Sequence, residues 1–209
     1  MYRLASLTLS LAVAPLLLAT AQIPDTLVVD GTEYSLQANP LGPWLREHPN
    51  ALPESKLVST ANWRGYLAKW TLRDGKLLLV DVTVSESIDE TRSVMKELFP
   101  GGGPVEATWF TGHLIVPTGE MVNYVHMGYA STYSSYLVAT IVNGRVQAKR
   151  NFTQQQFEAF RREQWARYRK TPEYAAQREE AKRGDASAGD QQIDDFLFVF
   201  ADYVTRVYP

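Results

Sequence analysis

The chain has 209 residues, of which 45% are hydrophobic and 21% are charged, and its formal net charge is −2. This size and composition predict one globular domain with a sizeable core. The small negative charge argues against a nucleic-acid-binding protein. Because the sequence has no cysteine, it excludes disulfides, thiol nucleophiles and cysteine-ligated metals.

Residues 1–21 have the pattern of a secretory signal peptide. Arg3 gives a short basic start, an apolar run covers 4–18, and the A-T-A at 19–21 matches the small-x-small cleavage pattern. A retained membrane anchor is the alternative, but the run is short for a span and contains hydroxylated residues. Cleavage is therefore predicted before Gln22, and the mature chain is expected in the periplasm or outside the cell, with no transmembrane span.

The mature chain begins with two predicted hairpins. Asp30-Gly31 and Asp74-Gly75 are strong turn signals, since a type I′ turn needs positive φ at both central residues. The flanking runs predict strands at 26–29, 32–36, 62–72 and 76–84. The proline-rich segment 39–53 is expected to be irregular, with one helical turn at 43–48.

Residues 85–99 change to a helical periodicity. Ile88, Met95 and Leu98 fall on one stripe, and Ser87 with Glu90 matches a capping box, so a helix is predicted. Three glycines follow at 101–103. They precede a strand and lack a following Gly-Lys-Ser/Thr, so they predict a connector and not a phosphate loop.

The stretch from Val105 to Tyr129 is the part of the sequence that most suggests a function. It carries two of the three histidines, and it is predicted to be a hairpin that turns at 118–119. In that register His113 lies opposite Tyr124, and His126 is its diagonal neighbour at about 7–8 Å. A shift of one residue would move one strand's side chains to the other face.

Two histidines this close are weak candidates for a metal site. Zinc sites usually have three or four protein ligands, and no third ligand is indicated by spacing near His113 and His126. No metal or cofactor is therefore expected. The alternative is that both rings form hydrogen bonds with Thr111 and Tyr124 on a partly wet face of the sheet.

The next segment, 128–136, interleaves small hydroxylated residues with Tyr129, Tyr133 and Tyr136. Tyrosine offers a large contact area at low entropic cost, and serine offers adaptable hydrogen bonds. The segment is therefore either a binding loop or a loop whose tyrosines pack on the sheet. A last hairpin is predicted at 137–149, with its turn at Asn143-Gly144.

The C-terminal part is predicted to be helical. A capping box at Thr153 begins one helix, and Thr171-Pro172 begins another. The composition of 184–190 predicts a flexible linker. Apolar residues then recur at helical spacing from Ile193 to Val207, which predicts an amphipathic helix that docks on the sheet or on a partner.

Four hairpin turns followed by three helical segments predict an α+β fold. We expect a curved antiparallel β-sheet built from hairpins and packed by the C-terminal helices, all within one domain that spans 22–209.

Four motifs carry a resemblance to a known group of proteins. They are Pro40-Leu41, W-R-G-Y-L-A-K-W at 63–70, W-F-T-G-H-L at 109–114 and Y-V-H-M-G-Y at 124–129. Together they resemble a family of exported or surface bacterial proteins that has no established activity. The resemblance covers roughly residues 23–160, and it implies a cellular location but no mechanism.

Two classes of function fit these features. The first is a non-catalytic binding module of the cell envelope, of which an immunity or inhibitor protein is a variant, with a protein or a small molecule as its ligand. Interfaces are rich in tyrosine and tryptophan, and the candidate binding residues are Trp109, His113, Tyr124, His126, Tyr129 and Tyr133.

The second class is a metal-dependent or histidine-based hydrolase centred on His113 and His126. It predicts a pocket in which both histidines meet a carboxylate. The lack of a recognised catalytic motif favours the binding module.

Overall fold

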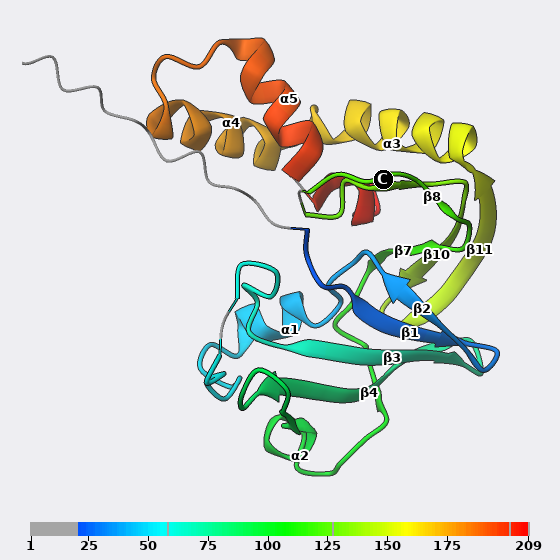
Figure 1. Cartoon of the computed structure of the whole chain (residues 1–209). Helices are drawn as coiled ribbons and strands as arrows, with labels where there is room; N and C mark the ends of the chain where they lie inside the picture. Colours follow the sequence, from blue (N-terminus) through cyan, green and yellow to red (C-terminus); the bar gives the residue numbers. More distant parts are fainter. Residues whose placement is uncertain (1–20, 58, 127, 201, 209) are drawn as a thin grey trace, which may run out of the picture.

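The structure is a computed structural model that describes residues 21–57, 59–126, 128–200 and 202–208. In this part of the chain, a nine-stranded and mostly antiparallel sheet is accompanied by a two-stranded ribbon and five α-helices. The predicted α+β class is confirmed, and three of the helices gather at one end of the sheet (Figure 1). No helix within these ranges is both long and apolar enough to cross a membrane.

The main sheet has the strand order β2-β1-β3-β4-β11-β10-β7, and two short strands pair with β4 outside this path. Its strands are β1 (Asp25–Val29), β2 (Thr32–Leu36), β3 (Leu67–Arg73), β4 (Lys76–Ser85), β5 (Thr91–Ser93), β6 (Val105–Glu106), β7 (Gly112–Pro117), β10 (Ser135–Val142) and β11 (Arg145–Thr153). Only β1 and β3 pair in parallel. The sheet bends until its two edges approach: the Gln37 amide after β2 donates to the Ile115 carbonyl of β7 at 2.8 Å.

The Asp-Gly and Asn-Gly turns predicted from the sequence are confirmed. Both residues of each pair have positive φ, with 50° and 82° at Asp30-Gly31, 54° and 72° at Asp74-Gly75, and 48° and 76° at Asn143-Gly144. Around these turns β1 pairs with β2, β3 with β4, and β10 with β11. The predicted helical turn is α1 (Gly42–Glu47), with a proline in its first turn.

The helix predicted at 85–99 is wrong. Instead, β4 extends to Ser85, β5 turns back along it, and only α2 (Met95–Leu98) is helical. The Ser87 amide donates to the Glu90 carbonyl at 3.2 Å, which closes a turn where a capping box was predicted. Ile88 is 86% exposed. The ladder hydrogen bonds to β4 therefore outweigh an apolar pattern of only three residues.

The predicted central hairpin is also wrong. β7 pairs with β10, so that His113 faces Thr140, and β8 (Met121–Asn123) pairs with β9 (Thr132–Tyr133). The amides of Thr118 and Gly119 donate to the Ser135 carbonyl at 3.0 and 3.2 Å. The eight-residue β10 offers β7 a longer ladder than the three-residue β8 can, and this sets the register.

The helical end of the molecule is built from α3 (Gln154–Tyr168), α4 (Pro172–Gly184), α5 (Asp190–Phe200) and the 3₁₀ helix η1 (Asp202–Thr205). The capping box at Thr153 and the N-cap at Thr171 are confirmed. The predicted linker coincides with the connection between α4 and α5. Ile193 and Leu197 of α5 pack against Tyr168 and Tyr174, so this helix covers its neighbouring helices, while η1 reaches the sheet at β7.

The main core lies within the curve of the sheet and includes Trp70, Leu27, Leu79 and Leu114, all fully buried. A second, smaller core joins α3 to β10 and β11, where the rings of Tyr136 and Phe157 stack with centroids 3.9 Å apart. The two cores leave the space beneath η1 only partly filled, and the candidate site lies there.

Candidate functional site

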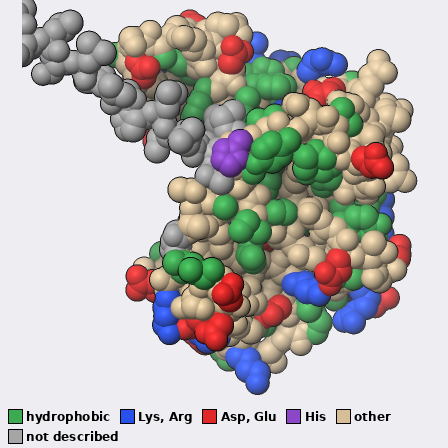
Figure 2. Space-filling model, viewed as in Figure 1, with side chains coloured by type: hydrophobic (Ala, Val, Ile, Leu, Met, Phe, Trp, Pro, Cys, Tyr) green, Lys and Arg blue, Asp and Glu red, His purple; other side chains and the backbone are tan. Residues whose placement is uncertain are grey.

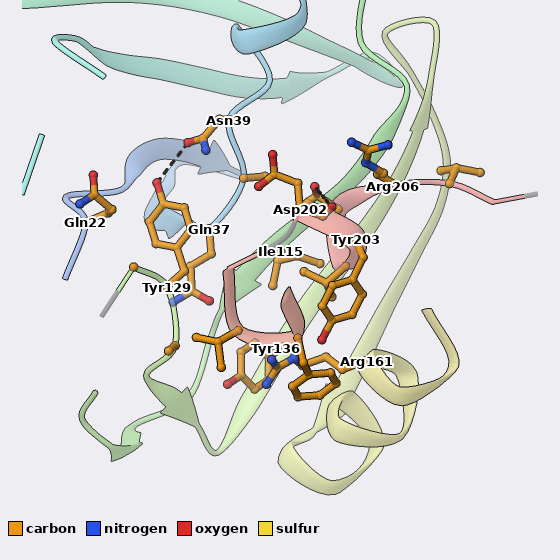
Figure 3. A pocket seen from close by; sticks show the side chains of 18 of the residues that line it. Gln22, Gln37, Asn39, Ile115, Tyr129, Tyr136, Arg161, Asp202, Tyr203 and Arg206 are labelled. Carbon is orange, nitrogen blue, oxygen red and sulfur yellow. Dashed lines mark hydrogen bonds between the residues drawn. The ribbon is translucent and has the colours of Figure 1, made fainter. Parts of the chain in front are cut away.

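A cavity of about 900 Å³ lies between the sheet, the loop at 128–132 and the C-terminal segment at 198–208. In Figure 3, Gln37 and Tyr129 lie on one side of it, and Tyr203 and Arg206 lie on the other. Ile115 of β7 and Tyr136 of β10 line it from the sheet. Because its walls come from segments far apart in the sequence, the site exists only in the folded chain.

One wall of the cavity is fixed by a hydrogen-bonded group centred on Asn39. Its Oδ1 accepts from the Tyr129 hydroxyl at 3.1 Å and from Arg64 Nη1 at 2.6 Å (Figure 3 shows the Tyr129 bond). Burial raises the pKa of Tyr129 to about 12. At neutral pH this phenol is therefore protonated and acts as a donor, so Tyr129 is a positioned binding group.

Behind this wall lies a buried ion pair between Arg64 and Asp25. Arg64 Nη1 is 2.9 Å from Asp25 Oδ1, and the two side chains are 5% and 0% exposed. The carboxylate also accepts from Trp70 Nε1 at 3.1 Å and from the Ala68 amide at 3.2 Å. This pair ties the start of β1 to β3 and holds Arg64 in place at the cavity.

The opposite wall is η1, which rests directly on β7. A Cβ at Gly112 would lie 2.6 Å from the Thr205 carbonyl oxygen, so only glycine allows this close approach. Tyr203 is fully buried, with its ring 5.2 Å from that of Trp165 and 6.0 Å from that of Tyr168. Packing of Tyr203 against the helices thus holds η1 in place.

Arg46, Arg206 and Asp202 add charge to the cavity lining. Part of the Asp202 side chain is exposed to solvent. Burial of its carboxyl nevertheless raises the pKa of Asp202, while the positive charges of Arg206 and Arg46 oppose the rise. Neither arginine side chain forms an ion pair or hydrogen bond with another residue in the described part of the chain. Both guanidinium groups act on Asp202 through charge alone.

The two candidate histidines do not meet. His113 is buried, its Nδ1 lies 3.1 Å from Thr140 Oγ1, and its ring is 5.3 Å from that of Phe160. Burial lowers the pKa of His113. His126 is exposed, with its Nδ1 2.7 Å from the Tyr124 hydroxyl. Their predicted pairing is wrong because β7, which carries His113, pairs with β10, and His126 lies outside any strand. Among the described residues, no cluster of three or more His, Asp or Glu could hold a metal.

The other candidate residues are also scattered. Trp109 packs against Phe99 and Trp44, and its Nε1 donates to the Pro40 carbonyl at 3.0 Å. Tyr133 lies edge-on to Tyr136. Of the six candidates, Tyr129 alone lines the cavity.

Tyr124 belongs to an exposed apolar surface. It is 57% exposed, and the neighbouring Met121 and Val122 of β8 are also exposed. Figure 2 shows hydrophobic side chains gathered over this part of the molecule. The tyrosines of segment 128–136 therefore differ in role, since Tyr129 and Tyr136 line the cavity while Tyr133 does not.

Sequence reasoning missed most of the cavity. The residues it did not identify include Gln37, Asn39, Arg46, Arg64, Arg161, Asp202, Tyr203 and Arg206. The one local signal was Arg64, which lies between aromatic residues in the W-R-G-Y motif. An arginine in such an apolar setting needs a buried partner, but the sequence does not indicate that Asp25 is that partner.

Comparison of the chain with protein-family models, with curated proteins and with solved structures gave no match.

Proposed function

We propose that this is an exported bacterial protein that acts as a non-catalytic binding module of the cell envelope, with the cavity beneath η1 as its binding site. The observation that carries the proposal is the cavity itself. Its volume of about 900 Å³ falls in the range of roughly 300–1,000 Å³ that is typical of small-molecule sites. Its walls also combine apolar surface with polar side chains, of which Asn39, Arg64 and Tyr129 are fixed by hydrogen bonds.

A binding role is supported by the state of the polar groups in the cavity. Tyr129 is held as a donor by Asn39, and neither His113 nor His126 lines the cavity. A hydrolase centred on those two histidines would need them to converge on one substrate. The geometry therefore favours recognition of a small molecule over hydrolysis.

Binding can be tested with Nile red, a neutral fluorescent probe that brightens in apolar sites. We expect saturable binding to the mature chain and at least about tenfold weaker binding to Ala130→Trp, because a large ring at this half-buried lining position fills the cavity. Ala148→Trp is the matched control, since Ala148 is exposed on β11. Absence of saturable binding to the wild-type chain, or equal loss in both variants, would contradict a binding site in this cavity.

Export is supported by the pattern of residues 1–21, of which 1–20 lie outside the described residues. When the full chain is expressed in a Gram-negative bacterium, we expect the protein in the periplasmic or secreted fraction, with an intact mass that begins at Gln22. Replacing Leu11 by Arg should interrupt the apolar run and leave an unprocessed chain inside the cell. Recovery of full-length wild-type protein from the cytoplasm would contradict export.

A further inference from the structure

The cavity wall presents an excess of hydrogen-bond donors. The hydroxyls of Tyr203 and Tyr208 and the Nε of Arg64 are buried, and none donates a hydrogen bond to another described residue. All three residues line the cavity. Arginine Nε can only donate, and a phenol readily donates. Because an unsatisfied buried donor is costly, these groups favour a ligand that brings acceptors.

Arg161 and Tyr203 form the most defined part of this wall. The hydroxyl of Tyr203 points toward Arg161 in Figure 3. The Arg161 guanidinium lies over the Phe198 ring at 4.8 Å, and it faces the Tyr203 oxygen, whose pKa it lowers against the effect of burial. Its contact with Glu158 is long, at 3.5 Å. That distance is at the outer limit of a hydrogen bond, so most of the five guanidinium donors remain for a ligand.

The charges around the cavity agree with an acceptor that is also an anion. Arg46, Arg64, Arg161 and Arg206 line it, against Asp202 and Glu173. Arg64 is neutralised by Asp25, but Arg161 is only weakly paired. The two acidic residues disfavour a dianion such as a phosphate monoester. A single carboxylate suits one planar guanidinium and one phenol.

Apolar side chains form another part of the lining. Phe110, Ile115, Phe157 and Val204 line it, and Val199 and Val207 are exposed along its lining. A ligand that only satisfied the polar wall would leave Val199 and Val207 in contact with water. The lining therefore fits a molecule with a carboxylate head and an apolar body.

We propose that the cavity binds an organic carboxylate with an apolar body, whose carboxylate is received by Arg161 and the Tyr203 hydroxyl. This inference rests on the proposed function, since it names the ligand class of the same cavity. The apolar body lies along the apolar part of the lining, which includes Val204 and Val207.

The test compares three probes that share one apolar chain, namely decanoate, decan-1-ol and decylamine, in displacement of Nile red at neutral pH. Decanoate is expected to bind at least about tenfold more tightly than decanol, and decylamine most weakly. Equal displacement by decanoate and decanol, or stronger displacement by decylamine, would overturn the carboxylate assignment while the cavity remained a binding site. If none of the probes, Nile red included, bound the wild-type chain, the proposed function would fail as well.

Two variants locate the carboxylate. Tyr203→Phe keeps the buried ring and deletes only the hydroxyl. We expect this variant to remain folded, to bind decanoate about tenfold more weakly and to bind decanol as the wild type does. Arg161→Gln should weaken decanoate more strongly, and Arg162→Gln, an exposed neighbour on α3, is the control. Unchanged decanoate binding in both Tyr203→Phe and Arg161→Gln would overturn the proposal.

Discussion

Replacement of Arg64 by Met is expected to lower the free energy of unfolding by about 3–5 kcal/mol, because it leaves a charged group buried without its partner. Asp25 is fully buried, and its Oδ1 is 2.9 Å from Arg64 Nη1. Met fills part of the volume of Arg64, so the loss of stability reflects the unpaired charge of Asp25 more than the loss of packing. The measurement is urea unfolding of the mature chain followed by tryptophan fluorescence.

The effect of Arg64→Met should depend on pH. Burial raises the pKa of Asp25 above its ordinary value of 3.8, and the Arg64 guanidinium opposes that rise. A carboxyl with a higher pKa in the folded state binds its proton more tightly there. Its contribution to stability therefore falls as pH rises from the unfolded pKa through the folded one. Without Arg64 the folded pKa of Asp25 rises further. The free energy of unfolding of the variant should therefore be closest to that of the wild type in acid, and the difference should be largest near neutral pH.

Two controls separate this effect from the loss of any ion pair. Lys69→Met removes the exposed pair with Glu33, and it should cost at most about 1 kcal/mol at any of these pH values. The double variant Asp25→Asn/Arg64→Met removes both buried charges and should recover part of the loss at neutral pH. A pH-independent loss in Arg64→Met, equal to that of the double variant, would show that the charge of Asp25 is not the cause.

Local chemistry is the part of the fold that could be predicted from the sequence. Asp30-Gly31 and Thr153 with its capping partner act within a few residues, so their hairpin and helix start could be read directly. The helix at 85–99 failed because strand pairing with β4 decides that segment. The central hairpin failed because β7 had two potential partners, and the longer strand β10 was the one selected.

The cavity could not be predicted because its chemistry is assembled by tertiary structure. Tyr129 is identified by the composition of its segment, whereas Arg161 is one of several charged residues on α3 and has no local signal. Nothing local relates it to Tyr203, whose hydroxyl lies near it only because η1 crosses β7. The histidines stood out through their chemistry and spacing, but the register on which their pairing depended is not the one the chain adopts.

Replacement of Gly112 by Val is expected to displace η1 and open the cavity. A Cβ at this position would lie 2.6 Å from the Thr205 carbonyl oxygen and 2.7 Å from the ring of Phe110. The first obstacle is backbone, so it cannot be relieved by rotating a side chain. Overpacking of this kind costs about 1–3 kcal/mol and occasionally more. The cost can be measured by urea unfolding.

The consequence for the site follows from the position of η1. Tyr203 and Asp202 belong to this segment, so its displacement should remove one wall of the cavity. We expect Nile red to bind at least about tenfold more weakly. We also expect faster proteolysis near residue 202. Gly101→Val is the matched control, because nothing lies within 4 Å of the added Cβ there and the backbone is unstrained. If Gly112→Val lost stability but bound Nile red as the wild type does, the wall formed by η1 would not contribute to binding. Retained stability together with lost binding would instead mean that η1 is held mainly by Tyr203 and the helices, and that the contact with β7 only sets the shape of the site.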